Sequence, residues 1–216
     1  MISKAYYICL KSSELRVKFV NEQVKKFQSI GRFPVEVFNA IEGPSIDCQK
    51  MRDDGLVEKD TWHNRDLTPG ELGCTLSHRA IWEKVLFGDK IMILEDDCEL
   101  VDGWYPRLIE VATKVLFCDL FVLASQHKTW PENRTKVKDD VYRSKRESGG
   151  TSGYIINQLA AKELLHESKV IKYATDGIVG NVSERVATYI TEPQLGFAQN
   201  FPSVIDPFGA RTYRAN

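Results

Sequence analysis

The chain has 216 residues, of which 43% are hydrophobic and 27% are charged, and its formal net charge at pH 7 is −1. This length and composition fit a single domain with a buried hydrophobic core. A nearly neutral chain without a long basic run has no field that attracts polyanions, so we expect no nucleic acid partner.

The cysteines and the hydrophobic pattern bear on the compartment. Five cysteines are spread along the chain without a C-x-x-C pair, which argues against a disulfide framework and a zinc site and is typical of a reducing compartment. The sequence has no apolar core of signal-peptide length and no apolar stretch near the roughly 20 residues of a membrane span. We therefore expect a soluble, cytoplasmic protein, at most peripheral at the inner face of the cytoplasmic membrane.

The first 41 residues predict a strand, a helix and a second strand. Ala5–Leu10 is a short apolar run rich in strand-forming residues, and Pro34–Ile41 is a second such run. Between them, apolar side chains recur at roughly helical spacing over residues 14–27. This order is a βαβ unit, which implies parallel pairing and an α/β sheet.

Residues 68–87, TPGELGCTLSHRAIWEKVLF, predict a helix with a well-defined start. Thr68 suits the N-cap position, a proline follows at the first helical position, and Glu71 completes a capping box. For His78, further along this helix, a hydrogen-bonded histidine on a half-buried surface is a simpler explanation than a ligand to a metal.

The next stretch, KIMILEDDCEL at residues 90–100, runs from an apolar strand into three adjacent carboxylates, Glu95, Asp96 and Asp97. Like charges at close range repel, so folding alone gives no reason for this cluster. Sheets of this class bind ligands beyond the carboxyl ends of their strands, and paired carboxylates there bind a hard divalent cation that can clamp a diphosphate. The alternative is a solvated strand end with three exposed charges.

The second half of the chain continues the alternation of predicted strands and helices. Residues 104–116 predict a helix, Asp119–Ser125 a strand, residues 154–168 a strand leading into a helix, and residues 187–193 another strand. Between them, residues 126–152 are polar and end in a Gly-rich segment. Their length predicts a mobile loop or a pair of exposed strands, and long loops of this kind often act as substrate lids.

One further carboxylate, Asp176, lies among apolar and small residues in YATDGIV. It is suited either to a helix cap or to a catalytic base in a partly dry site, where burial raises the pKa of a carboxyl group. Several well-known motifs are absent from the sequence: G-x-G-x-x-G after the first strand, the P-loop, H-E-x-x-H and G-x-S-x-G.

Taken together, LTPGELGCTLSHRAIWEKV, IMILEDDCEL and GTSGYIINQLAAKELL resemble glycosyltransferase family 25. The resemblance covers nearly the whole chain in the family's order, and bacterial members are lipopolysaccharide and lipooligosaccharide galactosyltransferases and glucosyltransferases. It implies a GT-A-like single α/β domain with a Rossmann-like nucleotide-binding half and a mixed, mainly parallel central sheet. About residues 1–100 would bind the nucleotide sugar, and about residues 101–216 the acceptor.

The resemblance also implies an activity. Such an enzyme moves galactose or glucose from a UDP-sugar to a lipooligosaccharide or lipopolysaccharide acceptor, with inversion at the anomeric carbon. Mn²⁺ or Mg²⁺, held by Glu95 and Asp97, would bridge the two phosphates of the donor, and Asp96 would face away, toward the ribose or a structural partner. Asp176 matches the family's later acidic position and would be the base.

Other positions are implied as contacts to the donor. They lie at the ends of the first two strands, on the capped helix, in the acidic cluster and in the Gly-rich segment: Leu10, Lys11, Arg16, Ala40, Ile41, Glu42, Thr75, His78, Asp96, Gly150 and Thr151. Two rival functions use the same residues. One is a nucleotidyltransferase or phosphohydrolase with the same acidic metal site, and the other is a non-catalytic relative that binds carbohydrate.

Overall fold

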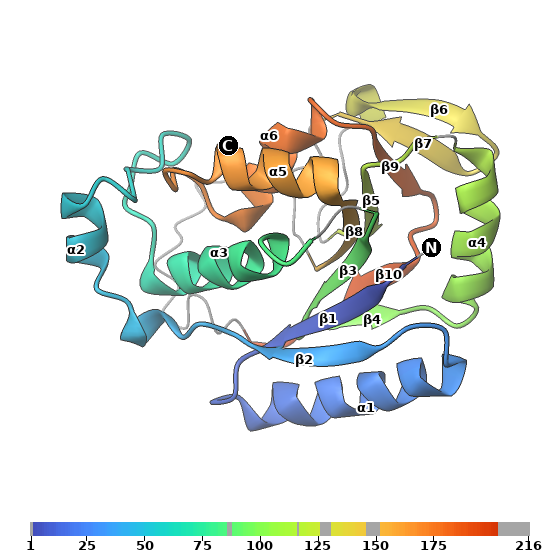
Figure 1. The fold of residues 1–216 in the computed structure, drawn as a ribbon, viewed down its shortest axis with the longest axis horizontal. Coiled ribbons are helices and arrows are strands. Elements are labelled where there is room, and N and C mark those ends of the chain that lie inside the picture. The colour runs from blue at the N-terminus through green and yellow to red at the C-terminus, as the bar shows by residue number, and fades with distance from the viewer. Residues whose placement is uncertain (1, 86–87, 116, 126–130, 146–151, 203–216) are drawn as a thin grey trace.

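The computed structural model describes residues 2–85, 88–115, 117–125, 131–145 and 152–202. In these residues, eight strands form one sheet and two more form a small antiparallel ribbon, β4 (Cys98–Leu100) with β10 (Gly196–Ala198) (Figure 1). The strand order of the large sheet is β2 (Val35–Asn39), β1 (Lys4–Cys9), β3 (Lys90–Glu95), β8 (Gly153–Asn157), β5 (Leu120–Ala124), β9 (Thr188–Thr191), β7 (Val141–Ser144) and β6 (Arg134–Lys138).

The predicted βαβ unit is present at one edge of the sheet. Helix α1 (Glu14–Ile30) connects β1 to β2, and β1 pairs in parallel with both β2 and β3. Because these three strands are parallel, their carboxyl ends lie at the same edge of the sheet. Ile8 of β1 is in register with Glu95 of β3, so the end of the first strand lies beside the acidic cluster.

The sheet as a whole is mixed, as the sequence predicts. β8 is antiparallel to both β3 and β5, and β7 is antiparallel to both β9 and β6. Among the strands of the described residues, these two run against the other six, so strand direction is mainly parallel. Their insertion nevertheless makes four of the seven pairings antiparallel, because each reversed strand lies between two neighbours of opposite direction.

Helices cover both faces of the sheet (Figure 1). α3 (Pro69–Trp82), α5 (Gln158–Glu167) and α6 (Thr175–Ser183) pack on one face, and α1 and α4 (Trp104–Lys114) pack on the other. Strand residues alternate between the two layers, with Tyr6 and Ile8 on the first face and Ala5, Tyr7 and Cys9 on the second. The short elements are α2 (Cys48–Asp53), η1 (Gly43–Ser45) and η2 (Pro131–Asn133).

The start of α3 confirms the predicted capping box. The Thr68 hydroxyl accepts from the Glu71 amide at 3.1 Å, and the Glu71 carboxylate accepts from the Thr68 amide at 2.8 Å. Further along α3, Gly73 allows the chain after β2 to pass close to the helix backbone. A Cβ at this position would lie 2.4 Å from the carbonyl oxygen of Ile41, which no larger residue tolerates.

Residues 134–144 form a β-hairpin, which confirms the expectation of paired strands for this part of the polar segment 126–152. β7 also pairs with β9, so the hairpin is fixed to the sheet and does not form a loose lid. The flanking residues 126–130 and 146–151, which include Gly150 and Thr151, lie outside the described residues.

Two further expectations concern cysteines and membrane spans. In the described residues, no disulfide joins any of the five cysteines. Among the helices of the described residues, none combines the length and the hydrophobicity needed to cross a membrane.

Candidate active site

The acidic cluster lies in a tight turn at the carboxyl end of β3. Glu95 is the last residue of the strand, Asp96 and Asp97 form the turn, and β4 begins directly afterwards. The alternation of side chains along the strand therefore ends at Glu95, and the turn brings both aspartates close to Arg16 of α1. Asp96 accepts from the side chain of Arg16 and, at 3.4 Å, from the backbone amide of Leu10. Three predicted donor contacts thus meet here.

Arg16 is the counter-charge of this turn. Its side chain is 8% exposed, forms an ion pair with Asp96, and lies 3.7 Å from a carboxylate oxygen of Asp97. Its second terminal nitrogen donates to the carbonyl oxygen of Pro202 at 3.1 Å, and its guanidinium lies 5.6 Å from the ring centre of Phe201. Arg16 therefore joins α1, the acidic turn and the chain after β10.

When Asp97 is ionised, its negative charge is not fully compensated by the described residues. It is 7% exposed, and its Oδ1 has no hydrogen-bond partner in the described part of the protein. Burial, and next the charge of Glu95, raise the pKa of Asp97 to about 7, while Arg16 opposes the shift. Burial also raises the pKa of Asp96, against the effect of Arg16.

These properties fit a divalent cation. Asp96 and Asp97 share one guanidinium, with the charge of Glu95 nearby, and a buried carboxylate oxygen without a partner is costly unless a cation or a donor satisfies it. Oxygen ligands of this kind suit Mn²⁺ or Mg²⁺. Asp97, with Glu95, is therefore a fitting place for the metal that the sequence resemblance implies.

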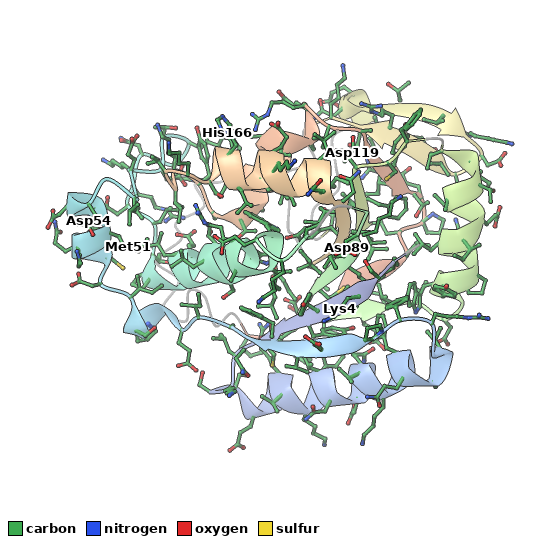
Figure 2. All side chains as sticks on the ribbon, in the orientation of Figure 1. Lys4, Met51, Asp54, Asp89, Asp119 and His166 are labelled. Carbon is green, nitrogen blue, oxygen red and sulfur yellow. The ribbon has the colours of Figure 1, made fainter. Side chains whose placement is uncertain are left out.

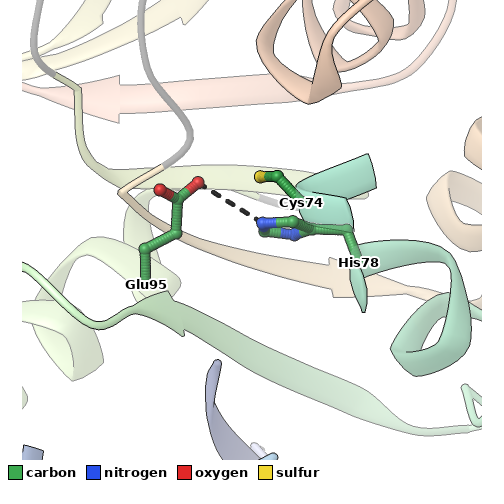
Figure 3. Close-up of side chains that lie close together, drawn as sticks. All are labelled: Cys74, His78 and Glu95. Carbon is green, nitrogen blue, oxygen red and sulfur yellow. Dashed lines mark ion pairs between the residues drawn. The ribbon is translucent and has the colours of Figure 1, made fainter. Parts of the chain in front are cut away.

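Glu95 itself faces α3 (Figure 3). One of its carboxylate oxygens lies 3.3 Å from Nε2 of His78, and the ligand atoms of Glu95, His78 and Cys74 all lie within 4.8 Å of one another. His78 is fully buried, and its Nδ1 lies 2.7 Å from the hydroxyl of Tyr154. The expectation of a hydrogen-bonded histidine is confirmed, and a direct contact between His78 and the donor stays a prediction.

Two hydrogen bonds in series orient this histidine. Trp82 Nε1–H donates to the Tyr154 hydroxyl oxygen at 2.9 Å. When the Tyr154 hydroxyl in turn donates to Nδ1 of His78, the proton of the neutral imidazole is on Nε2, which faces Glu95. Nε2 lies 3.3 Å from the Glu95 carboxylate but forms no hydrogen bond in the described residues, so the two side chains are close without being joined by one. Sequence reasoning missed Tyr154 and Trp82, because their roles depend on how α3 and β8 face each other.

The chain after β2 runs along the same edge of the sheet. Ala40 donates its amide to the carbonyl oxygen of Cys9 at 2.9 Å, and Ile41 donates its amide to the Ser77 hydroxyl at 2.8 Å. Ala40, Ile41 and the next residue, Glu42, therefore lie between the end of β1 and α3, where the sequence predicts donor contacts. Lys11, a further candidate, is exposed beside Leu10.

The start of α6 lies against the middle of α3. The hydroxyl of Thr175 lies 3.2 Å from that of Thr75 and 3.4 Å from Sγ of Cys74. Asp176 follows in the first turn and is partly exposed, and its Oδ1 accepts from the amide of Gly177 at 2.9 Å. The N-cap residue is Ala174, so the proposed cap role of Asp176 is wrong.

The remaining predicted contacts approach from β8. Gly150 and Thr151 are outside the described residues, but the carbonyl oxygen of Ser152, the next residue, accepts from the amide of Glu95 at 2.8 Å. By contrast, His166 lies exposed on the outer surface of α5 (Figure 2) and has no place at this site.

Comparison with known proteins adds independent findings. A family model described as glycosyltransferase family 25 (LPS biosynthesis protein) matches residues 2–179, a range that includes the acidic turn and Asp176. A protein of Aedes aegypti named glycosyltransferase 25 family member is 30% identical over 180 residues, which cover 79% of this chain and 29% of that protein. A putative glycosyltransferase of Haemophilus influenzae is 29% identical over 180 residues, covering 81% of this chain and 61% of that protein.

The chain thus spans less than a third of the insect relative and under two thirds of the bacterial one. Among solved structures, residues 1–349 of S. aureus TarS have a TM-score of 0.51 at 10% sequence identity, with 92% of this chain and 60% of that chain covered. This likeness concerns the fold alone. The GT-A-like α/β fold with a mixed sheet, predicted from the sequence, is confirmed.

Proposed function

The chain belongs to glycosyltransferase family 25, and on this premise we propose that it is an inverting, metal-dependent glycosyltransferase. Its donor is a UDP-sugar that supplies galactose or glucose, and its acceptor is a lipooligosaccharide or lipopolysaccharide. The observation that carries the proposal is the buried acidic turn, in which Asp97 retains a carboxylate oxygen without a partner in the described residues. The family description supports the acceptor class.

In this proposal, Glu95 and Asp97 hold Mn²⁺ or Mg²⁺, which supplies Lewis-acid stabilisation of the leaving UDP. His78 lies close to Glu95, and Arg16 fixes the orientation of Asp96 and Asp97. The ends of β1 and β2 and the middle of α3 provide the donor contacts: Leu10, Lys11, Ala40, Ile41, Glu42 and Thr75.

Asp176 is the proposed catalytic base. It takes the proton from an acceptor hydroxyl while that oxygen bonds to the anomeric carbon and the bond to UDP breaks. The product of an α-linked donor then has a β-linkage, and no covalent enzyme intermediate is needed. Two features support this role: Asp176 is partly exposed, and its neighbour Thr175 contacts α3 beside the Glu95–His78 pair.

The proposal also covers which part of the chain binds each substrate and where in the cell the protein works. We propose that donor binding is mainly the work of about residues 1–100 and acceptor binding mainly that of about residues 101–216. We also propose that the protein works in the cytoplasm, peripheral to the inner face of the membrane that carries its acceptor.

A nucleotide-sugar screen tests the proposal and separates it from its rivals. We expect UDP release from UDP-galactose or UDP-glucose that requires Mn²⁺ or Mg²⁺, rises with acceptor and is abolished by EDTA. Pyrophosphate released from CTP or ATP would favour a nucleotidyltransferase, and phosphate released from a nucleotide or phosphate ester would favour a phosphohydrolase. Carbohydrate binding without UDP release would favour the non-catalytic relative.

Asp97→Asn provides the matched variant for this screen. An amide cannot neutralise a cation, so we expect the Asp97→Asn variant to keep the fold and to lose nearly all transfer activity. Asp102→Asn, at an exposed carboxylate five residues further on, is the control and should transfer sugar at the wild-type rate. Near-native activity of Asp97→Asn would contradict the metal assignment.

A further inference from the structure

An aromatic pair, formed by the exposed Trp62 and the partly buried Tyr173, lies outside the residues used so far. Trp62, from the loop between α2 and α3, is 45% exposed, and Tyr173 comes from the segment just before α6. Their ring centres are 4.6 Å apart, with the planes inclined by 39°. A single exposed tryptophan is common in proteins, so the pair needs further evidence before it indicates a binding site.

Hydrogen bonds within the loop that carries Trp62 fix its conformation. Asp60 is 2% exposed, and its side chain accepts from the backbone amides of Trp62 at 2.8 Å and His63 at 3.2 Å. The same carboxylate pairs with Nδ1 of His63 at 2.7 Å. The hydroxyl of Thr61 lies 3.2 Å from that of Tyr173. Trp62 is therefore displayed at the surface by a fixed turn.

The pair also lies directly against the residue that follows the proposed base. A Cβ at Gly177 would lie 2.9 Å from Cβ of Tyr173 and 3.2 Å from the indole ring of Trp62. The amide of Gly177 donates to the carboxylate of Asp176 at 2.9 Å. Glycine at this position thus allows the two rings to pack on the backbone beside the Asp176 carboxylate.

We propose that Trp62 and Tyr173 form a stacking platform for the acceptor saccharide, so that one sugar ring rests on Trp62 while a hydroxyl group reaches Asp176. This inference rests on the proposed function. The C–H face of a pyranose ring is apolar and gains from burial against an aromatic face, while the hydroxyls of Thr61 and Tyr173 and the ring of His63 offer polar partners at the edge. The platform combines residues from both halves of the chain.

The test uses Trp62→Ala, with core oligosaccharide released from lipooligosaccharide by mild acid as the probe. We expect the KM for this acceptor to rise about tenfold or more, while acceptor-independent UDP release and UDP binding stay at wild-type values. Trp62→Phe keeps a ring and should recover most of the loss. Phe117→Ala, at a 79% exposed side chain before β5, is the control and should leave the KM unchanged.

A second measurement does not depend on turnover or on the stability of the alanine variant. The indole N–H resonance of Trp62, identified by its absence in Trp62→Phe, should shift when the oligosaccharide is added to wild-type protein. No shift, or a wild-type acceptor KM in Trp62→Ala, would overturn the platform. If the wild type instead binds the oligosaccharide through Trp62 but releases no UDP from any nucleotide sugar, the platform stands and the proposed transferase function fails.

Discussion

At the scale of single residues, Arg16 shows how this site tolerates its own charge. A guanidinium that is almost completely buried pairs with Asp96 and approaches Asp97. Two buried carboxylates without this partner would repel each other and lose hydration at the same time. The arginine therefore contributes to folding even if it also contacts the donor.

Arg16→Met tests this stabilising role. We expect the free energy of unfolding, measured by urea denaturation without metal, to fall by about 3–5 kcal/mol, because the variant leaves buried carboxylates without a counter-charge. Arg185 pairs with glutamates at a more exposed position, so Arg185→Met should cost less than about 1 kcal/mol. Equal losses in the two variants would show that Arg16 is not a buried counter-charge.

Cys74 allows a test of which atoms hold the metal. With Asp97, Glu95 offers an oxygen-only set, whereas with Cys74 and His78 it offers the mixed set that zinc prefers. Our proposal uses the oxygen set, so we expect Cys74→Ser to change the Mn²⁺ dissociation constant, measured by calorimetry, less than about twofold. A tenfold loss of Mn²⁺ affinity, or wild-type activation by zinc alone, would move the metal to α3.

Sequence alone indicated part of this site. Three adjacent carboxylates after an apolar strand have no purpose in folding, so Glu95, Asp96 and Asp97 were recognisable as candidates. The pairing of Glu95 with His78 depends on the rotation of α3 relative to β3, and no local pattern encodes that rotation. The direction of Asp97 was hidden for another reason, because a two-residue turn replaces the strand after Glu95.

At the scale of elements, the start of α3 combines a helix cap with an ion pair. The Glu71 carboxylate accepts from the Thr68 amide and also from both terminal nitrogens of Arg65, at 2.7 and 2.8 Å. Glu71 is 2% exposed. The box therefore fixes the start of the helix and the preceding loop together.

Glu71→Ala should accordingly lower stability without affecting donor binding. We expect Thr68→Ala to cost about 0.5–2 kcal/mol in thermal or urea unfolding and Glu71→Ala to cost more, since it also removes the partner of Arg65. Glu71→Gln can still accept from the Thr68 amide, so its loss in the free energy of unfolding should be smaller than that of Glu71→Ala. A large loss of UDP affinity without a lower melting temperature would place Glu71 in the donor site.

Elements defined by local signals were predictable, and those defined by distant partners were not. The βαβ unit and the cap at Thr68 follow from periodicity and turn chemistry within a few residues. The antiparallel place of β8 between β3 and β5 depends on pairing with strands that are distant along the chain. For residues 134–144 the sequence permits both a loop and a pair of strands, because it is polar and the partner strand, β9, is distant along the chain.

At the scale of the whole molecule, donor binding should protect one region of the sheet. Hydrogen exchange with UDP and Mn²⁺ should slow at the β1–α1 junction, in the turn at Asp96 and Asp97, and at residues 40–42, because these segments meet at the same edge. The β6–β7 hairpin lies at the far end of the strand order and should exchange unchanged. Protection confined to that hairpin would place the nucleotide elsewhere.

The position of β8 also has a consequence for how the protein is made. β3 is completed by residue 95, yet its partner on one side is β8, roughly sixty residues later in the chain. At ribosomal rates of about 5–20 residues per second, β8 is made about 3–12 s after β3. During this time the edge of β3 that pairs with β8 is open, and the apolar side chains of Ile91–Leu94 are not fully buried. A fragment that ends near residue 100 keeps this edge open permanently, so residues 1–100 alone should need either a chaperone or the rest of the chain to remain soluble during synthesis.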